Sequence, residues 1–90
     1  GYTITVVGLG SGELNQLPLG VYRHLKQQPL VWLRTKEHPV VQELEAEGLV
    51  FESFDSVYES SDAFEEVYDQ IVETLLSRSE EIAITYAVPG

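Results

Sequence analysis

Short apolar runs rich in β-branched and aromatic residues alternate with segments of helical periodicity along this chain. The runs expected to be strands are residues 3–7, 30–33, 49–54 and 82–88. Between them, apolar residues recur at spacings of three and four, which is the period of a helix with one buried face. Strands that alternate with helices require right-handed crossovers and parallel pairing. We therefore predict an α/β fold, a mainly parallel four-stranded sheet with helices on both faces in a three-layer arrangement.

Two of the predicted helices are delimited by proline and glycine. The first covers residues 17–27, carries an apolar stripe, and is ended by Pro29. The second begins at Pro39, because proline is favoured at the first helical position. Gly48 then stops this helix, since glycine is common just past a helix end.

The third predicted helix, residues 64–76, has the clearest periodicity. Asp62 and Glu65 have the spacing of a capping box, which marks a helix start. We expect its apolar residues to be core: Phe64, Val67, Tyr68, Ile71, Val72, Leu75 and Leu76. The preceding residues, 55–62, are rich in serine and acidic residues and are predicted to form a surface loop.

Composition restricts the classes of function. The 90 residues include 15 acidic and 5 basic side chains, a formal net charge of −10, which disfavours nucleic acid and anionic lipid as partners. There is no cysteine, so we expect a reducing, cytoplasmic location. Two histidines without cysteine give no credible zinc site, and we predict no metal site.

No apolar run approaches the ~20 residues of a membrane span. Methionine is absent even from position 1, so we expect a piece of a longer protein.

A glycine-rich turn directly follows the first strand and provides the first candidate site. Gly8, Gly10 and Gly12 stand at alternate positions, with Ser11 and Glu13 beside them. Glycine lets a ligand approach backbone N–H groups closely, and in open parallel sheets ligands bind beyond the carboxyl ends of the strands. A tight turn that needs positive φ explains the same glycines equally well.

A group of basic residues follows the second strand, at the same expected edge of the sheet. Arg34, Thr35, Lys36 and His38 would offer a positive region to an anionic substrate. The favoured alternative is structural: Arg34 and Lys36 pair with nearby acids while His38 caps the next helix. The other histidine, His24, is expected to face solvent.

Known nucleotide-binding motifs are not met. The turn has no third glycine at the spacing of a dinucleotide fingerprint, and Arg34 stands where that fingerprint requires an acid. Such an arginine would suit only a phosphorylated ribose. Because Arg34 could bind a phosphorylated ribose, a nucleotide-binding Rossmann-like domain is kept as a further alternative, although its motif is incomplete.

Several longer motifs resemble one family. Residues 4–13 resemble the opening strand and G-x-G-P-G-D loop of the tetrapyrrole (corrin/porphyrin) methylases, which use S-adenosylmethionine, and 14–25 are similar to that family's first helix. The motifs L-R-T-K-E-H-P-V-V at 33–41, F-E-S-F-D-S-V-Y-E at 51–59 and Y-A-V-P-G at 86–90 resemble the subgroup fused to a MazG-type nucleoside triphosphate pyrophosphohydrolase. The resemblance covers essentially all 90 residues.

The resemblance implies a fold and a set of site residues. Residues 1–90 would form the N-terminal subdomain of a methylase-like domain, cut within the loop after its fourth strand, with the first strand inside the sheet. Val88, Pro89 and Gly90 would approach the cofactor. The substrate would be bound by the remaining candidates: Gly8, Gly10, Ser11, Gly12, Glu13, Arg34 and Thr35. Ser11 and Glu13 depart from the family, which usually has proline and aspartate there.

The resemblance also implies an activity. We expect part of a bifunctional methylase and pyrophosphohydrolase that acts on a small-molecule substrate and forms a homo-oligomer, with the 90 residues inactive alone. In the alternative, this unit is a non-catalytic binding or regulatory module attached to the pyrophosphohydrolase. Mg²⁺ is expected only if that second enzyme follows, since none of its ligands lie in these residues.

Overall fold

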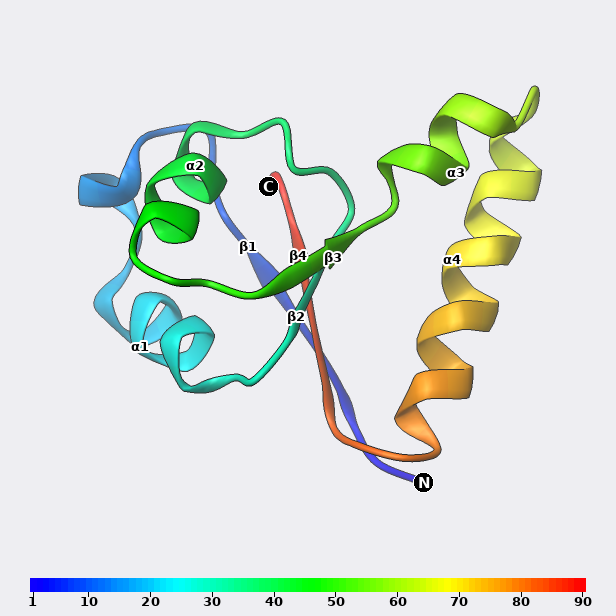
Figure 1. The fold of residues 1–90 in the computed structure, drawn as a ribbon, viewed down its shortest axis with the longest axis horizontal. Helices are drawn as coiled ribbons and strands as arrows, with labels where there is room; N and C mark the ends of the chain where they lie inside the picture. The colour runs from blue at the N-terminus through cyan, green and yellow to red at the C-terminus, as the bar shows by residue number, and fades with distance from the viewer.

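The computed structural model describes residues 1–90 and contains one four-stranded parallel sheet (Figure 1). Its strands are β1 (Ile4–Gly8), β2 (Val31–Leu33), β3 (Phe51–Ser53) and β4 (Ile84–Val88). The strand order is β1-β4-β2-β3, and each neighbouring pair is parallel. The predicted α/β fold with a parallel sheet is thus confirmed. Within these residues β1 is an edge strand paired only with β4, so the interior position implied by the resemblance is not met here.

The helices begin and end close to where the sequence places them. They are η1 (Leu14–Gln16), α1 (Leu19–Gln27), α2 (Pro39–Ala46), α3 (Asp55–Ser60) and α4 (Phe64–Ser79), of which η1 is a 3₁₀ helix. Pro39 occupies the first position of α2, and Gly48 follows its end with a φ of 98°. No helix is long and apolar enough to cross a membrane.

Helix α3 corrects the prediction of a loop over residues 55–62. Phe54 is buried just before the helix, and its carbonyl accepts hydrogen bonds from the N–H groups of Val57 and Tyr58. Val57 and Tyr58 also pack against the core. Asp55 adds a negative charge in the first turn, where the helix dipole favours it. These local contacts outweigh the low helix propensity of the serines.

The predicted capping box of α4 is also wrong. The N-cap is Ala63, and no side chain caps the helix. The helix therefore begins one residue later than the box requires, and the third helical position belongs to Glu66 in place of Glu65.

Two hydrophobic clusters lie on opposite faces of the sheet. On one face, Leu25 of α1 and Val40, Val41 and Leu44 of α2 pack with Val31 and Leu33 of β2. On the other face, Val67, Ile71 and Leu75 of α4 pack with Trp32 and Ile84. Trp32 stands between Val31 and Leu33 in β2, so the alternation of a strand sends neighbouring side chains to different clusters. In Figure 1, α1 and α2 accordingly lie on one side of the strands and α4 on the other.

Part of the expected core of α4 is exposed. Phe64, Tyr68, Val72 and Leu76 keep 73%, 56%, 52% and 56% of their surface accessible, whereas Val67, Ile71 and Leu75 are buried. A helix that packs on a sheet buries only a narrow stripe of side chains. The residue that follows each buried one lies on the flank of the helix and stays exposed.

His24 also corrects a prediction, because it does not simply face solvent. It is partly buried, and its Nε2 lies 2.9 Å from Oγ1 of the buried Thr85 in β4. The hydroxyl of Thr85 requires a partner beneath the sheet, and α1 supplies it.

Candidate functional site

The three candidate segments meet at the carboxyl edge of the sheet. The N–H of Leu9, just after β1, donates to the carbonyl of Val88 over 2.8 Å. The N–H of Arg34, just after β2, donates to the carbonyl of Ala87 over 3.0 Å. The end of β4 is therefore fixed between the glycine turn on one side and the Arg34–Lys36 segment on the other.

The backbones of Gly10 and Gly90 almost touch. A Cβ atom built on Gly90 would lie 3.5 Å from the Cα of Gly10, and one built on Gly8 would lie 3.9 Å from the Cα of Gly90. Gly10 has a φ of 72°, a conformation that strains residues with a side chain. The structure thus meets the requirement for positive φ at Gly10, and it also brings bare backbone from two candidate segments together.

Hydrogen-bond donors remain free in one part of the turn. The N–H of Glu13 donates to Oε1 of Gln16 over 2.9 Å, and the N–H of Leu14 donates to Oε2 of Glu43 over 2.8 Å. The N–H groups of Gly10, Ser11 and Gly12 donate to no atom of the protein. Three successive donors at the sheet edge can bind the oxygen atoms of a ligand.

Gly12 is required for another reason than Gly10. A Cβ at Gly12 would lie 1.5 Å from Oε1 of Gln16, the atom that accepts the hydrogen bond from Glu13. The absence of a side chain at this position therefore lets Gln16 fold back and fix the end of the turn. Sequence reasoning missed Gln16 and Glu43 as supports of the turn, and no local motif indicates the contact across 29 residues between Leu14 and Glu43.

His38 links the glycine turn to α2. Its buried ring accepts a hydrogen bond at Nδ1 from the N–H of Val40 over 3.1 Å, which confirms the predicted cap. The Nε2 atom lies 2.6 Å from the carbonyl oxygen of Gly10. Because Nδ1 accepts, Nε2 carries the proton and donates to Gly10. Both ring nitrogens are therefore engaged in holding the turn.

Asp55 organises the segment after β2. Its carboxylate accepts a hydrogen bond from Oγ1 of Thr35 over 2.6 Å and one from the N–H of Lys36 over 2.9 Å. Burial raises the pKa of Asp55, but these hydrogen bonds and the charge of Lys36 outweigh it, so the pKa lies below its ordinary value. The sequence does not reveal this role, because Asp55 lies 20 residues from Thr35, in a segment that the sequence predicts to be a loop.

The predicted ion pairs of Arg34 and Lys36 with nearby acids are absent: the two salt bridges of the structure join Lys26 to Glu47 and Arg78 to Glu81. Arg34 instead lines an open cavity of about 340 Å³ beside α3 and α4. Its charge partly opposes the rise in the pKa of Tyr86, which burial causes. Arg34 thus shares the sheet edge with the glycine turn through its backbone, while its side chain lines a cavity that the turn does not reach.

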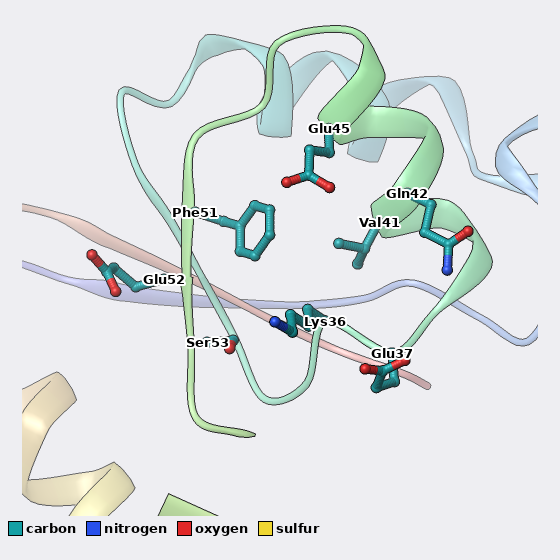
Figure 2. Close-up of a pocket in the computed structure, with 8 residues that line it drawn as sticks. All are labelled: Lys36, Glu37, Val41, Gln42, Glu45, Phe51, Glu52 and Ser53. Carbon is teal, nitrogen blue, oxygen red and sulfur yellow. The ribbon is translucent and has the colours of Figure 1, made fainter. Parts of the chain in front are cut away.

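Another open hollow lies between α2 and β3. Figure 2 shows its lining, which encloses about 460 Å³: Lys36, Glu37, Val41, Gln42, Glu45, Phe51, Glu52 and Ser53. Only two of these side chains are apolar, and three are glutamates. The hollow contains none of the glycine-turn or Val88–Gly90 residues and shares Lys36 with the Arg34–Lys36 segment, so it adjoins only that side of the candidate site.

Comparisons with known proteins give one relative. The chain is 42% identical over 87 residues to the uncharacterized protein YabN of Bacillus subtilis (strain 168). The match covers 97% of this chain and 18% of that protein, so the chain spans less than a fifth of its relative's length. No protein-family model and no solved structure matches. The name of this relative states no activity.

Proposed function

We propose that the chain is the N-terminal part of a three-layer, tetrapyrrole-methylase-like domain that binds S-adenosylmethionine at the carboxyl edge of its sheet. Val88, Pro89 and Gly90 would hold the cofactor. The glycine turn from Gly8 to Glu13 would face the methyl acceptor, and Arg34 and Thr35 would contact it from the neighbouring cavity beside α3 and α4. The observation that carries the proposal is the close approach of Gly10 and Gly90, because it creates a side-chain-free backbone surface where parallel sheets bind ligands.

The residues present suit an anionic methyl acceptor and a cationic cofactor. The free N–H groups of Gly10, Ser11 and Gly12 suit carboxylate oxygens of the methyl acceptor, which this turn would face. The acidic side chains beside the turn, Glu13 and Glu43, suit a cationic ligand. When bound, the cofactor supplies an electrophilic methyl group on a sulfonium. The chain's own contribution is to orient the reactants, which can supply most of the rate in such a displacement.

His38 has a positioning role in this proposal. Its two ring nitrogens hold Val40 and Gly10, so it fixes the turn and takes no part in proton transfer. The turn is therefore suited to binding and alignment.

Calorimetric titration of the full-length gene product with S-adenosylhomocysteine tests the proposal. We expect binding, and we expect Gly10→Ala to weaken it at least tenfold, because alanine at positive φ costs roughly 1–2 kcal/mol and moves the turn that lies against Gly90, a residue placed at the cofactor. Gly48→Ala is the matched control, since Gly48 has a φ of 98° but follows α2, away from the site. A folded protein that gives no heat at millimolar ligand excludes the proposal.

A second candidate is a non-catalytic binding module attached to a nucleoside triphosphate pyrophosphohydrolase. The engagement of both nitrogens of His38 favours it, because the turn then offers ligand-binding groups without a histidine acid or base. In this case the full-length protein would hydrolyse nucleoside triphosphates with Mg²⁺ bound by residues outside this chain. Hydrolysis that persists in Gly10→Ala, without any methyl transfer by the wild-type protein, would favour this candidate over the first.

A further inference from the structure

The sheet has a free backbone edge at β3, which pairs only with β2. The carbonyl of Val50 and the N–H of Phe54, on either side of β3, are bonded to β2 over 3.1 Å and 3.0 Å. Successive residues of a strand direct their backbone groups to alternate sides, so the N–H and C=O groups of Phe51 and Ser53 point away from β2. They form no hydrogen bond with the rest of the chain and can pair with another strand.

The hollow of about 460 Å³ between α2 and β3, which we call the α2–β3 hollow, adjoins this edge. Figure 2 shows Phe51 and Val41 directed towards each other across the hollow, with Glu45 beyond them, while Glu52 points to the other side of β3. An extended segment beside β3 would therefore send alternate side chains into the hollow and the intervening ones towards Glu52.

The charges around this edge are acidic and uncompensated. Glu37, Glu45 and Glu52 form no ion pair and accept no hydrogen bond within the chain, and Lys36 is the one cation that lines the hollow. Lysine and arginine have apolar stems that can lie on the ring of Phe51 while their charged ends reach the carboxylates. The hollow is therefore complementary to a basic segment.

A second copy of the chain fits this edge poorly. Two β3 strands that pair antiparallel over all three residues would set Glu52 opposite Glu52, and like charges in that position are destabilising. Each copy also carries a net charge of −10, so two acidic hollows would meet against a general repulsion. The short, acidic edge is thus protected from pairing with itself.

The next strand of the chain's own sheet also fits this edge poorly. The connections through α1 and α2 advance from β1 towards β3 on one face of the sheet. A right-handed crossover that placed a further strand beyond β3 would lie on this same face, which α1 and α2 already cover (Figure 1). A separate polypeptide meets no such obstacle.

We propose that the free edge of β3 and the α2–β3 hollow bind an extended, basic segment of another protein. The segment adds to the sheet as a further strand and directs lysine or arginine side chains towards Glu37, Glu45 and Glu52. In strand addition, backbone hydrogen bonds give affinity, and pockets for alternate side chains give specificity. The inference does not depend on the proposed function, because the hollow contains none of the glycine-turn or Val88–Gly90 residues.

Fluorescence anisotropy of the full-length protein with a labelled peptide tests the inference. The probe is a short peptide of alternating arginine and threonine. Its control is the same peptide with every backbone amide N-methylated, which keeps the charge but cannot donate to a strand edge. We expect the control to bind at least about tenfold more weakly, because it loses the backbone hydrogen bonds.

Two substitutions separate the charge from the strand edge. Glu45→Gln should weaken binding about threefold or more, whereas Glu66→Gln, at an exposed position on α4, is the matched control and should not. Ser53→Pro should weaken binding about tenfold, because it removes an outward N–H. Proline is tolerated where the N–H of an edge strand faces outwards, and urea unfolding checks that this variant folds.

A crosslink locates the occupant. These 90 residues contain no cysteine, and any cysteine elsewhere is replaced by serine. A photoreactive group on Val50→Cys, at an exposed position just before β3, should join the peptide. Failure to bind the peptide, equal affinity for the two peptides, or equal effects of Glu45→Gln and Glu66→Gln would overturn the inference. Without peptide, a crosslink from position 50 to the same polypeptide or to a second copy would overturn it in favour of that occupant.

Discussion

His38 shows how one side chain can hold two separate parts of the site. It caps α2 through Val40 and reaches Gly10 in the glycine turn. We expect His38→Ala to lower the free energy of unfolding by about 1–3 kcal/mol, because it removes a cap and leaves buried groups unsatisfied. Urea unfolding of the full-length protein measures this loss.

His38→Asn separates the two contacts. Asparagine is a good N-cap, so this variant should regain most of the stability. Its shorter side chain should not replace the contact with Gly10, and we expect affinity for S-adenosylhomocysteine to fall in both variants. Equal affinity in wild type and His38→Asn would contradict a role for the Gly10 contact in shaping the turn.

The lowered pKa of Asp55 predicts that the stability of the fold depends on pH. Since its pKa in the folded state lies below the ordinary value of 3.8, its carboxylate stabilises the fold above that value, and this contribution disappears as the pH falls through the lowered pKa. Asp55→Asn should therefore be less stable than wild type at about pH 7, and the difference should close below about pH 4. Asp69→Asn, at an exposed position without a hydrogen bond, is the control. A difference that is independent of pH would show that the charge of Asp55 has no part in it.

At the scale of elements, α1 offers a matched pair of leucines. Leu25 is 1% exposed within the cluster shared with α2, whereas Leu19 is 57% exposed. Leu25→Ala should cost about 2–5 kcal/mol of unfolding free energy, because it leaves a cavity. Leu19→Ala should change it by no more than about 0.5 kcal/mol. Chemical denaturation checks both, and similar losses would contradict the packing of α1.

The spacing of apolar residues and the positions of proline and glycine predict the helices and strands of this fold well, but they predict its tertiary contacts poorly. Pro39 and Gly48 mark the limits of α2, and the three- and four-residue spacing correctly finds α4. The same spacing does not reveal how wide the buried face is, because that width depends on what packs against the helix. It therefore predicts Val72 to be core, whereas Val72 is exposed in the structure. In the candidate site, the glycine turn is visible in the sequence. The bond from Thr35 to Asp55 is not, since it depends on how β2 and β3 end side by side.

At the scale of the whole molecule, the strand order determines which strand ends lie side by side and which strand edge stays unpaired. The first two crossovers place β2 and β3 on one side of β1, and the third returns to insert β4 between β1 and β2. This return brings the end of β4 against the glycine turn, so the candidate site depends on the last strand of the sheet. It also leaves the outer edge of β1 free. Exposed apolar residues lie on the same side of the sheet as α4, and we call them the α4–β1 surface: Val6, Phe64, Tyr68, Val72 and Leu76.

Residues 1–90 prepared alone should therefore self-associate, and more strongly as salt is added. An uncovered strand edge and an apolar patch favour pairing between copies. The net charge of −10 opposes it, but the Debye length falls from ~30 Å at 0.01 M salt to ~10 Å at 0.1 M, which weakens the repulsion. Light scattering across salt concentrations measures the effect. Val72→Glu should reduce association more than Ser77→Glu, because both add one charge but only the first lies on the α4–β1 surface. A monomer at high salt, or equal effects of the two substitutions, would mean that this surface does not drive association.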